Sequence, residues 1–579
     1  MSYRKVSMVV VLAAVACAGA KEQTRPAAPA PDAPLAQASD PAAQVAPGQA
    51  PQDTQQAAPP ATTGPGEAGK KTIPIGKEAP LPAAQAAQGA PPPAAQTAIA
   101  EAPLMPDAEF RGQKPAAFDR QLSFEAPVPS DQKLKNGART LVAENHAIPI
   151  VAIDVVFLHG IDADPLAKAG LAEFVADMVD EGTKTRTAPQ FAEELENLAA
   201  QLHVSAGRET TSVHLNCLAE TLPKALELLA DLVQNPAFRP EDVARVRKLK
   251  LTQLQAKRAS VGALAGDEAN RILYGEKHPW GQPAGGTPET VGRIGEEDLR
   301  KFHAAWWVPN NAVVSVAGDV KTADVVKLLD EKLAGWKSRP LPGLMLPKLP
   351  KLQERRIIAL DKQGTTQSQV WVLGQLFPAR EADAIPLRVA NTPLGGMFSS
   401  RLNLNLREKH GYSYGVGSRV ALERSTGAFR AAGGIVAKNT VEALTEYEKE
   451  IEKYAAEGPS DEELASAKEA VIRGVPSLLE TNDAVSTAMA TLVSLELPLT
   501  YYKALPAQVR KVTKADAARV AKKWLHPAQW PILIVGPVND KQEALEKLGY
   551  GSVEVRPAVA PDAPVPSAQK PSSAVGALK

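Results

Sequence analysis

Residues 298–309 read DLRKFHAAWWVP, and residues 516–527 read DAARVAKKWLHP. Each segment predicts a helix that begins near its Asp and stops before its Pro. An apolar run follows each proline and ends at a glycine, Gly318 in the first segment and Gly536 in the second. The Asp-to-Pro and Pro-to-Gly spacings are identical in the two copies. Because shared spacing over this length is hard to obtain by chance, the chain is predicted to contain a duplicated domain.

The two copies are expected to occupy residues 117–339 and 351–553, with the Pro-rich segment 340–350 as a linker. Both begin with predicted strands and continue with strands and helices that do not alternate regularly. Residues 203–218, for example, alternate apolar with polar side chains, as a pair of half-buried strands does. The pattern predicts an α+β fold: two homologous domains in a clamshell, each a largely antiparallel sheet with helices packed on one face.

The composition excludes some classes of function. The chain has 579 residues, enough for two or three domains, and its 65 basic and 65 acidic residues give a formal net charge of zero. Nucleic acid and anionic membrane surfaces are therefore not expected as electrostatic partners. Of its two cysteines, Cys17 falls in a leader segment and Cys217 in the first copy. No internal disulfide is expected once the leader is removed.

The first residues have the pattern of a secretory signal. A basic pair precedes an apolar run over residues 6–19, which predicts a signal peptide over residues 1–20, too short to span a membrane comfortably. Residues 18–20, AGA, fit ordinary cleavage and would give a soluble periplasmic or secreted protein. Residues 14–17, AVAC, resemble a bacterial lipobox and would place a lipid on Cys17. We favour the lipoprotein, a periplasmic chain anchored in the bacterial cell envelope, because a long tether follows.

That tether and a similar tail flank the duplicated region. Residues 21–116 and 554–579 are rich in Ala, Pro, Gln and Gly and poor in aromatic residues. Such segments cannot bury enough apolar surface to offset the entropy lost on ordering, so both are predicted to be disordered. Their prolines favour extended stretches, and we interpret them as spacers rather than binding elements.

Two further stretches contain the residues on which the functional prediction rests. Residues 170–183, GLAEFVADMVDEGT, predict a helix over residues 171–180. Residues 395–418, GGMFSSRLNLNLREKHGYSYGVGS, predict a helix, a turn at residues 410–411 and an extended run that begins at Tyr414.

These stretches resemble the insulinase and pitrilysin type of zinc peptidases, the inverzincins. HPWG at residues 278–281 and the segment 302–319 also resemble landmarks of that family, so the resemblance extends over residues 134–551. Active members carry H-x-x-E-H on the helix that corresponds to residues 171–180. There the two histidines bind zinc, the glutamate polarises the attacking water, and a glutamate on a later helix completes the coordination.

This chain departs from the family at each of those positions. Glu173 stands at the first histidine, Ala176 at the general base and Asp177 at the second histidine, and Gln253 aligns with the later glutamate. The resemblance therefore implies no zinc site and no catalytic residue in this chain, since a methyl group cannot accept a proton. Glu173 and Asp177 could bind Ca²⁺ or Mg²⁺, but those ions need more oxygen ligands, and we favour a solvated helix face.

The other half of the family's site is retained. The family places an Arg and, seven residues later, a Tyr against the substrate, and Arg407 and Tyr414 match that spacing. A guanidinium donates in a fixed fork to backbone carbonyls and a phenol adds one donor, so the pair is predicted to bind the substrate peptide. The alternative makes Arg407 a cation at a helix end and Tyr414 a half-buried aromatic residue of a strand.

A serine motif competes with this interpretation. Residues 411–415 match G-x-S-x-G, the nucleophile elbow of serine hydrolases, with Ser413 as the nucleophile. The elbow needs a strand before the serine and a helix after it, whereas the order predicted here is helix and then strand, so we disfavour it. Single histidines elsewhere are interpreted as structural residues, namely His146, His203, His214 and His303.

The sequence therefore predicts a substrate-binding, non-catalytic subunit of a cell-envelope zinc metalloendopeptidase, inactive on its own. The expected partner is a chain of the same family that carries H-x-x-E-H and the zinc, joined in a heterodimer. The expected substrate is a peptide or unfolded protein, and membrane contact is expected through the lipid anchor alone. The alternative is an anchored peptide-binding or scaffold protein with no peptidase role.

Overall fold

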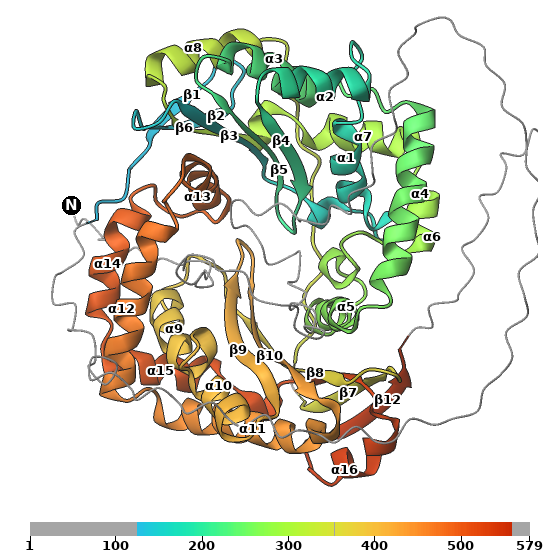
Figure 1. The fold of residues 1–579 in the computed structure, drawn as a ribbon, viewed down its shortest axis with the longest axis vertical. Coiled ribbons are helices and arrows are strands. Elements are labelled where there is room, and N and C mark those ends of the chain that lie inside the picture. The colour runs from blue at the N-terminus through green and yellow to red at the C-terminus, as the bar shows by residue number, and fades with distance from the viewer. Residues whose placement is uncertain (1–123, 353, 559–579) are drawn as a thin grey trace, which may run out of the picture. The chain divides into compact units, whose positions relative to one another are not determined.

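The computed structural model describes residues 124–352 and 354–558. The predicted signal peptide with Cys17, the predicted tether and residues 559–579 lie outside the described residues. The described chain forms two similar halves, each built around one six-stranded sheet (Figure 1). The predicted α+β fold of two homologous domains is confirmed.

The first half contains a sheet with the strand order β1-β2-β6-β3-β5-β4. Its neighbouring pairs are antiparallel except for β2 with β6. Its strands are β1 (Ser130–Lys133), β2 (Arg139–Glu144), β3 (Ile150–Phe157), β4 (Gln201–Ala206), β5 (Thr211–Leu218) and β6 (Ala312–Gly318). Its helices are α1 (Leu171–Val179), α2 (Ala188–Asn197), α3 (Leu222–Gln234), α4 (Pro240–Lys257), α5 (Val261–Tyr274), α6 (Pro288–Arg293), α7 (Glu296–Trp306) and α8 (Thr322–Lys332).

The second half repeats this arrangement with the strand order β12-β7-β11-β8-β10-β9. β7 runs parallel to β11 and β12, and the other pairs are antiparallel. Its strands are β7 (Arg356–Asp361), β8 (Gln367–Leu376), β9 (Ser413–Leu422), β10 (Gly427–Val436), β11 (Ile532–Gly536) and β12 (Ser552–Pro557). Its helices are α9 (Ala384–Asn391), α10 (Arg401–Asn403), α11 (Thr440–Glu457), α12 (Asp461–Ser477), α13 (Asn482–Ser494), α14 (Tyr501–Lys511), α15 (Lys514–Trp524) and α16 (Gln542–Glu546).

The segments that predicted the duplication occupy the same place in the two halves. Asp298 caps α7 by accepting a hydrogen bond from the Gly295 amide at 2.9 Å, and Asp516 caps α15 by accepting one from the Thr513 amide at 3.0 Å. A short 3-10 turn begins at each proline and leads into β6 or β11, whose residues are buried throughout. Each of these strands lies third in its sheet, which explains why both runs are apolar.

Most helices of each half pack on one face of its sheet, as predicted, and one helix from the other half lies against the opposite face. α13, from the second half, lies against β6 and β3 of the first sheet, where its Val485 and Met489 join Leu141 in a small apolar cluster (Figure 1). α5, from the first half, lies against β8 and β11 of the second sheet. A pattern within one half does not say which helix covers the face of the sheet opposite its own helices, so the repeat could not predict this exchange.

The second half ends later than the sequence suggested. The predicted boundary at residue 553 falls inside β12, which pairs with β7 along its whole length. Residues 554–557, predicted to belong to the disordered tail, are therefore part of the sheet. Backbone pairing with an existing strand stabilises this short segment although its composition resembles that of the tail.

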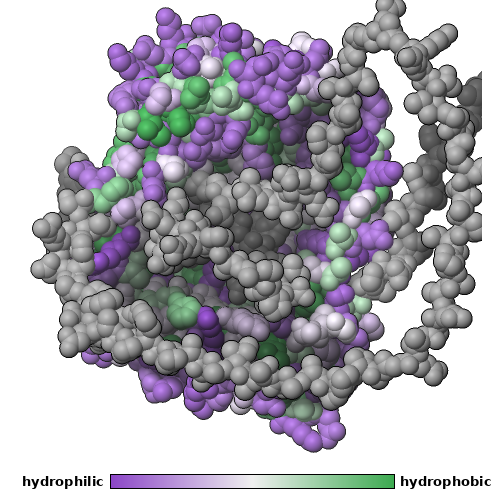
Figure 2. All heavy atoms as spheres, in the orientation of Figure 1, coloured by the Kyte–Doolittle hydropathy of each residue, from purple (hydrophilic) through white to green (hydrophobic). Residues whose placement is uncertain are grey.

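The surface of the described residues is mostly hydrophilic on the face that Figure 2 shows, with smaller hydrophobic patches. A search of the same residues found no helix with both the length and the apolar character that crossing a bilayer requires. Among the described residues, the most exposed large hydrophobic side chains are Met345 in the linker at 92%, Tyr414 at 70% and Phe398 at 65%.

Candidate functional site

α1 is the helix on which active relatives would carry their zinc ligands, and it is fixed at its start by backbone contacts. Gly170 has a φ of +92° and lies so close to the Gly285 carbonyl that a Cβ would be 2.6 Å from it. Buried Asp164 accepts hydrogen bonds from the amides of Gly170 at 2.9 Å and Ala172 at 2.8 Å. Burial raises the pKa of Asp164 well above its ordinary value, although those amides oppose the shift. The N-cap position of α1, residue 170, therefore needs glycine.

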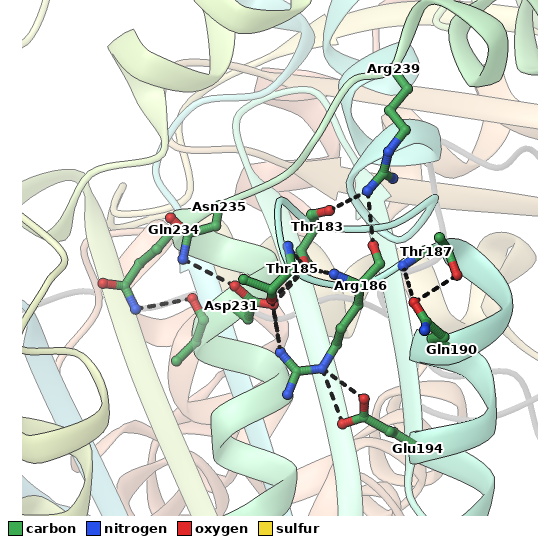
Figure 3. Close-up of polar contacts among 11 residues, drawn as sticks. Thr183, Thr185, Arg186, Thr187, Gln190, Glu194, Asp231, Gln234, Asn235 and Arg239 are labelled. Atoms are coloured by element: carbon green, nitrogen blue, oxygen red, sulfur yellow. Dashed lines mark hydrogen bonds and ion pairs between the residues drawn. The ribbon is translucent and has the colours of Figure 1, made fainter.

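The loop after α1 is held by a half-buried carboxylate, Asp231 of α3 (Figure 3). Asp231 accepts hydrogen bonds from the hydroxyls of Thr183 at 2.6 Å and Thr185 at 2.9 Å, and from the Arg186 guanidinium at 2.7 Å. Although burial alone would raise the pKa of Asp231, these bonds hold it below its ordinary value. Arg239 donates to the carbonyl of Thr183 at 2.7 Å. α1 is thus anchored at both ends.

The outer side of α1 presents Glu173 and Asp177 to α4, and Lys250 of α4 lies between them. Its ammonium is 2.6 Å from Asp177 Oδ2 and 3.4 Å from Glu173 Oε2. The Lys250 side chain is only 7% exposed. Burial disfavours charge on Lys250, but the two carboxylates outweigh it and raise its pKa, while burial raises the pKa of Glu173. A fixed cation therefore lies between the two degenerate ligand positions and offsets part of their negative charge.

This arrangement does not fit zinc. The base position is filled by Ala176, whose methyl group is buried, with 3% of the residue exposed. Gln253, which aligns with the later ligand, is exposed on α4, and Lys250 one turn earlier makes the contact instead. In the part of the chain that the structure describes, no cluster of three or more His, Cys, Asp or Glu residues is arranged to hold a metal ion. An ammonium at the centre of the carboxylate pair would repel a dication.

Sequence reasoning missed Lys250. The signal available was the pair of carboxylates four residues apart on a helix whose neighbouring residues are apolar. Such a pair requires a cationic partner when it is partly buried. Choosing Lys250 among the several basic residues of α4 required the helix packing.

The stretch over residues 395–418 folds as predicted into a helical segment, a turn and a strand. α10 continues into π-helical turns over Leu404–Lys409, and Gly411, with a φ of +65°, closes the helix by donating its amide to the Arg407 carbonyl at 3.0 Å. β9 then begins at Ser413. Gly411 is in the left-handed region that ends many helices, which is why the turn was recognisable.

Arg407 and Tyr414 are both accessible. The Arg407 side chain is 39% exposed, pairs with Glu408 Oε1 at 3.3 Å, and places its guanidinium carbon 4.6 Å from the centre of the Phe398 ring. Tyr414 is 70% exposed, so it is not the half-buried aromatic residue of the alternative interpretation. Within the described residues, no hydrogen bond or ion pair joins Arg407 to the Glu173, Asp177 and Lys250 group.

Ser413 does not have the surroundings of a nucleophile. It is 7% exposed, its hydroxyl lies 2.7 Å from the Gly434 carbonyl, and it accepts a hydrogen bond from the Gly415 amide at 3.0 Å. It opens a strand after a helix, the reverse of a nucleophile elbow. Its hydroxyl instead hydrogen-bonds backbone groups at the start of β9.

Two of the single histidines, His303 and His214, make structural contacts. His303 lies 3.0 Å from the Val233 carbonyl, and burial lowers its pKa to about 4. His214 of β5 lies 3.0 Å from Asp154 of β3 and 2.8 Å from Asp483 of α13. Burial opposes charge on His214, but its bonds to both carboxylates raise its pKa to about 10. A charged imidazole thus holds α13 against the first sheet.

One edge of the first sheet is suited to binding an extended chain. β4 ends the strand order and pairs with β5 alone among the described strands. Its residues alternate between exposed and half-buried, and α1 lies beside it. The outer edge of such a strand presents N–H and C=O groups to which a peptide can add as a further strand.

Two family profiles match the chain in succession. The profile described as "Insulinase (Peptidase family M16)" matches residues 139–277, and the one described as "Peptidase M16 inactive domain" matches residues 293–471. The chain is 29% identical over 343 residues to an "Uncharacterized zinc protease" of Rickettsia bellii, covering 58% of this chain and 80% of that protein. It is 26% identical over 415 residues to the "Non-peptidase homolog YmxG" of Helicobacter pylori, covering 70% and 90%.

Solved structures share the fold. A peptidase M16 inactive domain from Pseudomonas fluorescens superposes with a TM-score of 0.66 at 22% identity, covering 71% of this chain and 98% of that one. A protease from Helicobacter pylori gives a TM-score of 0.66 at 21% identity, covering 71% and 100%.

Proposed function

Because the chain belongs to the insulinase (M16) family of peptidases, we propose that it is the substrate-binding, non-catalytic subunit of a zinc metalloendopeptidase. Its partner would be a chain of the same family that carries H-x-x-E-H and the zinc. The observation that carries this proposal is the Lys250 ammonium between Glu173 and Asp177, beside a buried Ala176 at the base position. A site with a fixed cation between its ligand positions and a methyl group at its base position cannot activate water in the family's way.

The proposal assigns binding to two surfaces. The edge of β4 would take the peptide as an added strand through backbone hydrogen bonds. Arg407 and Tyr414 would donate hydrogen bonds to peptide carbonyls, because both are exposed and both carry donors. When the partner's zinc site is brought to the peptide, the same donors would stabilise the oxyanion that forms during attack.

The proposed place of action is the bacterial cell envelope. The apolar run over residues 6–19 and the AVAC sequence ending at Cys17 support a lipid-anchored periplasmic chain, with residues 21–116 as the tether. Metabolic labelling with a fatty acid would test the anchor, since a Cys17→Ala chain should lose the label.

The test of function uses the mature chain alone and together with a chain of the same family that carries H-x-x-E-H, sought first in the adjacent reading frame. We expect no cleavage of an unfolded protein by the single chain, cleavage by the pair, and loss of that cleavage with a chelator. The variants Arg407→Ala and Tyr414→Phe should lower cleavage by the pair without separating the two chains.

Chelator-resistant cleavage by the single chain would contradict the proposal. Peptide binding by a chain that neither associates with nor activates a zinc-carrying relative would favour the anchored scaffold instead.

A further inference from the structure

Phe398 is an exposed aromatic ring on a firmly held backbone. Its side chain reaches solvent, with 65% of the residue exposed. Yet the buried Asn403 side chain donates to the Phe398 carbonyl at 2.8 Å and accepts a hydrogen bond from the Val416 amide of β9 at 3.1 Å. Three residues earlier, a Cβ on Gly395 would lie 2.2 Å from the Ser418 amide nitrogen. The ring is therefore presented to solvent by a segment that is locked onto β9.

The ring also contacts the Arg407 guanidinium and restricts its position. The guanidinium carbon of Arg407 is 4.6 Å from the centre of the Phe398 ring, within the range of a cation–π contact. Its Nε is 3.3 Å from Glu408 Oε1. A planar guanidinium that stacks on a ring keeps N–H groups at its rim, where they can donate to a carbonyl. Phe398 thus limits the orientations of a long side chain that is otherwise exposed.

The charges around the ring favour an uncharged partner. Arg407 pairs with Glu408, Arg401 pairs with Glu463 at 2.7 Å, and His410 lies 3.7 Å from Glu446. Because Arg401 and Arg407 each have a carboxylate beside them, these two guanidinium groups offer little net positive charge to an anionic lipid or to nucleic acid. Leu404 and Tyr414, at 45% and 70% exposed, add apolar surface in the same stretch of chain.

We propose that Phe398 is a positioning and specificity-determining residue of the peptide-binding site. It holds Arg407 ready to donate to a peptide carbonyl, and its exposed ring packs against an aromatic or aliphatic side chain of that peptide. The substrate class is therefore an extended peptide with an apolar side chain next to the bound carbonyl. This inference rests on the proposed function, since it takes a peptide as the ligand.

The experiment measures binding of two labelled, unstructured peptides to the full mature chain by fluorescence anisotropy. One peptide carries a single Phe among small polar residues, and the other carries Ala at that position. We expect the wild-type chain to bind the Phe peptide about three- to tenfold more tightly. Phe398→Ala should abolish that preference and weaken both peptides about threefold, since it also releases Arg407.

Two conservative variants separate the roles of the ring. Phe398→Tyr keeps the aromatic face and should retain both the preference and the affinity. Phe398→Leu keeps an apolar contact but loses the cation–π contact, so it should retain much of the preference and weaken both peptides. Met345→Ala, at a 92% exposed apolar residue of the linker, is the matched control and should change neither quantity.

The outcomes distinguish this inference from the function on which it rests. Failure of the wild-type chain to bind either peptide would contradict the proposed function itself. Binding that Phe398→Ala leaves unchanged in strength and preference would overturn the inference and leave the proposed function standing. The inference would also be overturned if Phe398→Tyr lost peptide affinity and the preference for Phe as Phe398→Ala does, while both variants unfold at the wild-type temperature.

Discussion

The two halves share one strand order but place their charged groups differently. In the first half, charges are neutralised within the fold: Lys250 lies between Glu173 and Asp177, and His214 is held between Asp154 and Asp483. In the second half, Arg407 and Tyr414 remain accessible on a rigid segment. The comparison shows how one duplicated fold can hold its charged groups in internal ion pairs in one copy and leave hydrogen-bond donors accessible in the other.

The largest expected effect is on folding stability and concerns Lys250 in the first half. Lys250→Met would leave two neighbouring carboxylates without their cation, one of them partly buried. We expect the free energy of unfolding to fall by about 3 kcal/mol, measured by urea denaturation. Lys248→Met changes an exposed lysine of the same helix and should stay within about 0.5 kcal/mol of the wild type.

A second substitution shows whether charge is the cause. In the double variant Lys250→Met with Asp177→Asn, one of the repelling carboxylates is removed, so part of the lost stability should return. No recovery in the double variant would mean that packing of the lysine stem, rather than ion pairing, explains the loss.

The next effect concerns the charged histidine between the halves. Because the pKa of His214 is raised from 6.5 to about 10, its contribution is fully present below pH 6.5 and is lost as the pH rises through about 10. His214→Asn should lower the free energy of unfolding by about 2 kcal/mol at pH 6 and flatten its decline at alkaline pH.

His214 lies against Asp154 and Asp483, and these carboxylates also accept hydrogen bonds from Thr487 and Asn216. His203 of β4 is the cross-strand partner of His214, so the variant His203→Asn shows whether the neighbouring imidazole adds to the pH dependence. His526→Asn, at an exposed histidine of the second half, is the control and should keep the wild-type pH profile. An unchanged profile in His214→Asn would contradict the assignment.

A smaller effect is expected on peptide binding by the second half. Arg407→Ala should weaken peptide binding about tenfold, because it removes a charged donor that makes fork-like hydrogen bonds. Urea denaturation should show little change, since the side chain is 39% exposed. Lys409→Ala, at an exposed neighbour, should bind peptide like the wild type.

The smallest effect is that of Tyr414→Phe, which removes one hydroxyl and keeps the ring. We expect peptide affinity to fall about threefold, the value of one neutral hydrogen bond to a ligand. Equal binding by wild type and variant in a fluorescence titration would show that the ring of Tyr414, rather than its hydroxyl, contacts the peptide.

Much of the fold could be predicted from local patterns. The Asp caps of α7 and α15, the prolines that end those helices and the buried strands after them are short-range features, so the duplication was visible in the sequence. The turn at Gly411 was predictable for the same reason, because few residues other than glycine adopt its φ of +65°. β12 was missed because its pairing with β7 is a long-range contact.

The sequence by itself determined that position 176 offers no proton acceptor and positions 173 and 177 no imidazole, and that Arg407 and Tyr414 keep their spacing, since these depend on which residues are present. Only the tertiary structure decided which cation meets Glu173 and Asp177, which helix of the other half lies against each sheet, and that Phe398 stacks on Arg407. Those contacts join residues from different elements, and their partners are chosen by packing rather than by any local pattern.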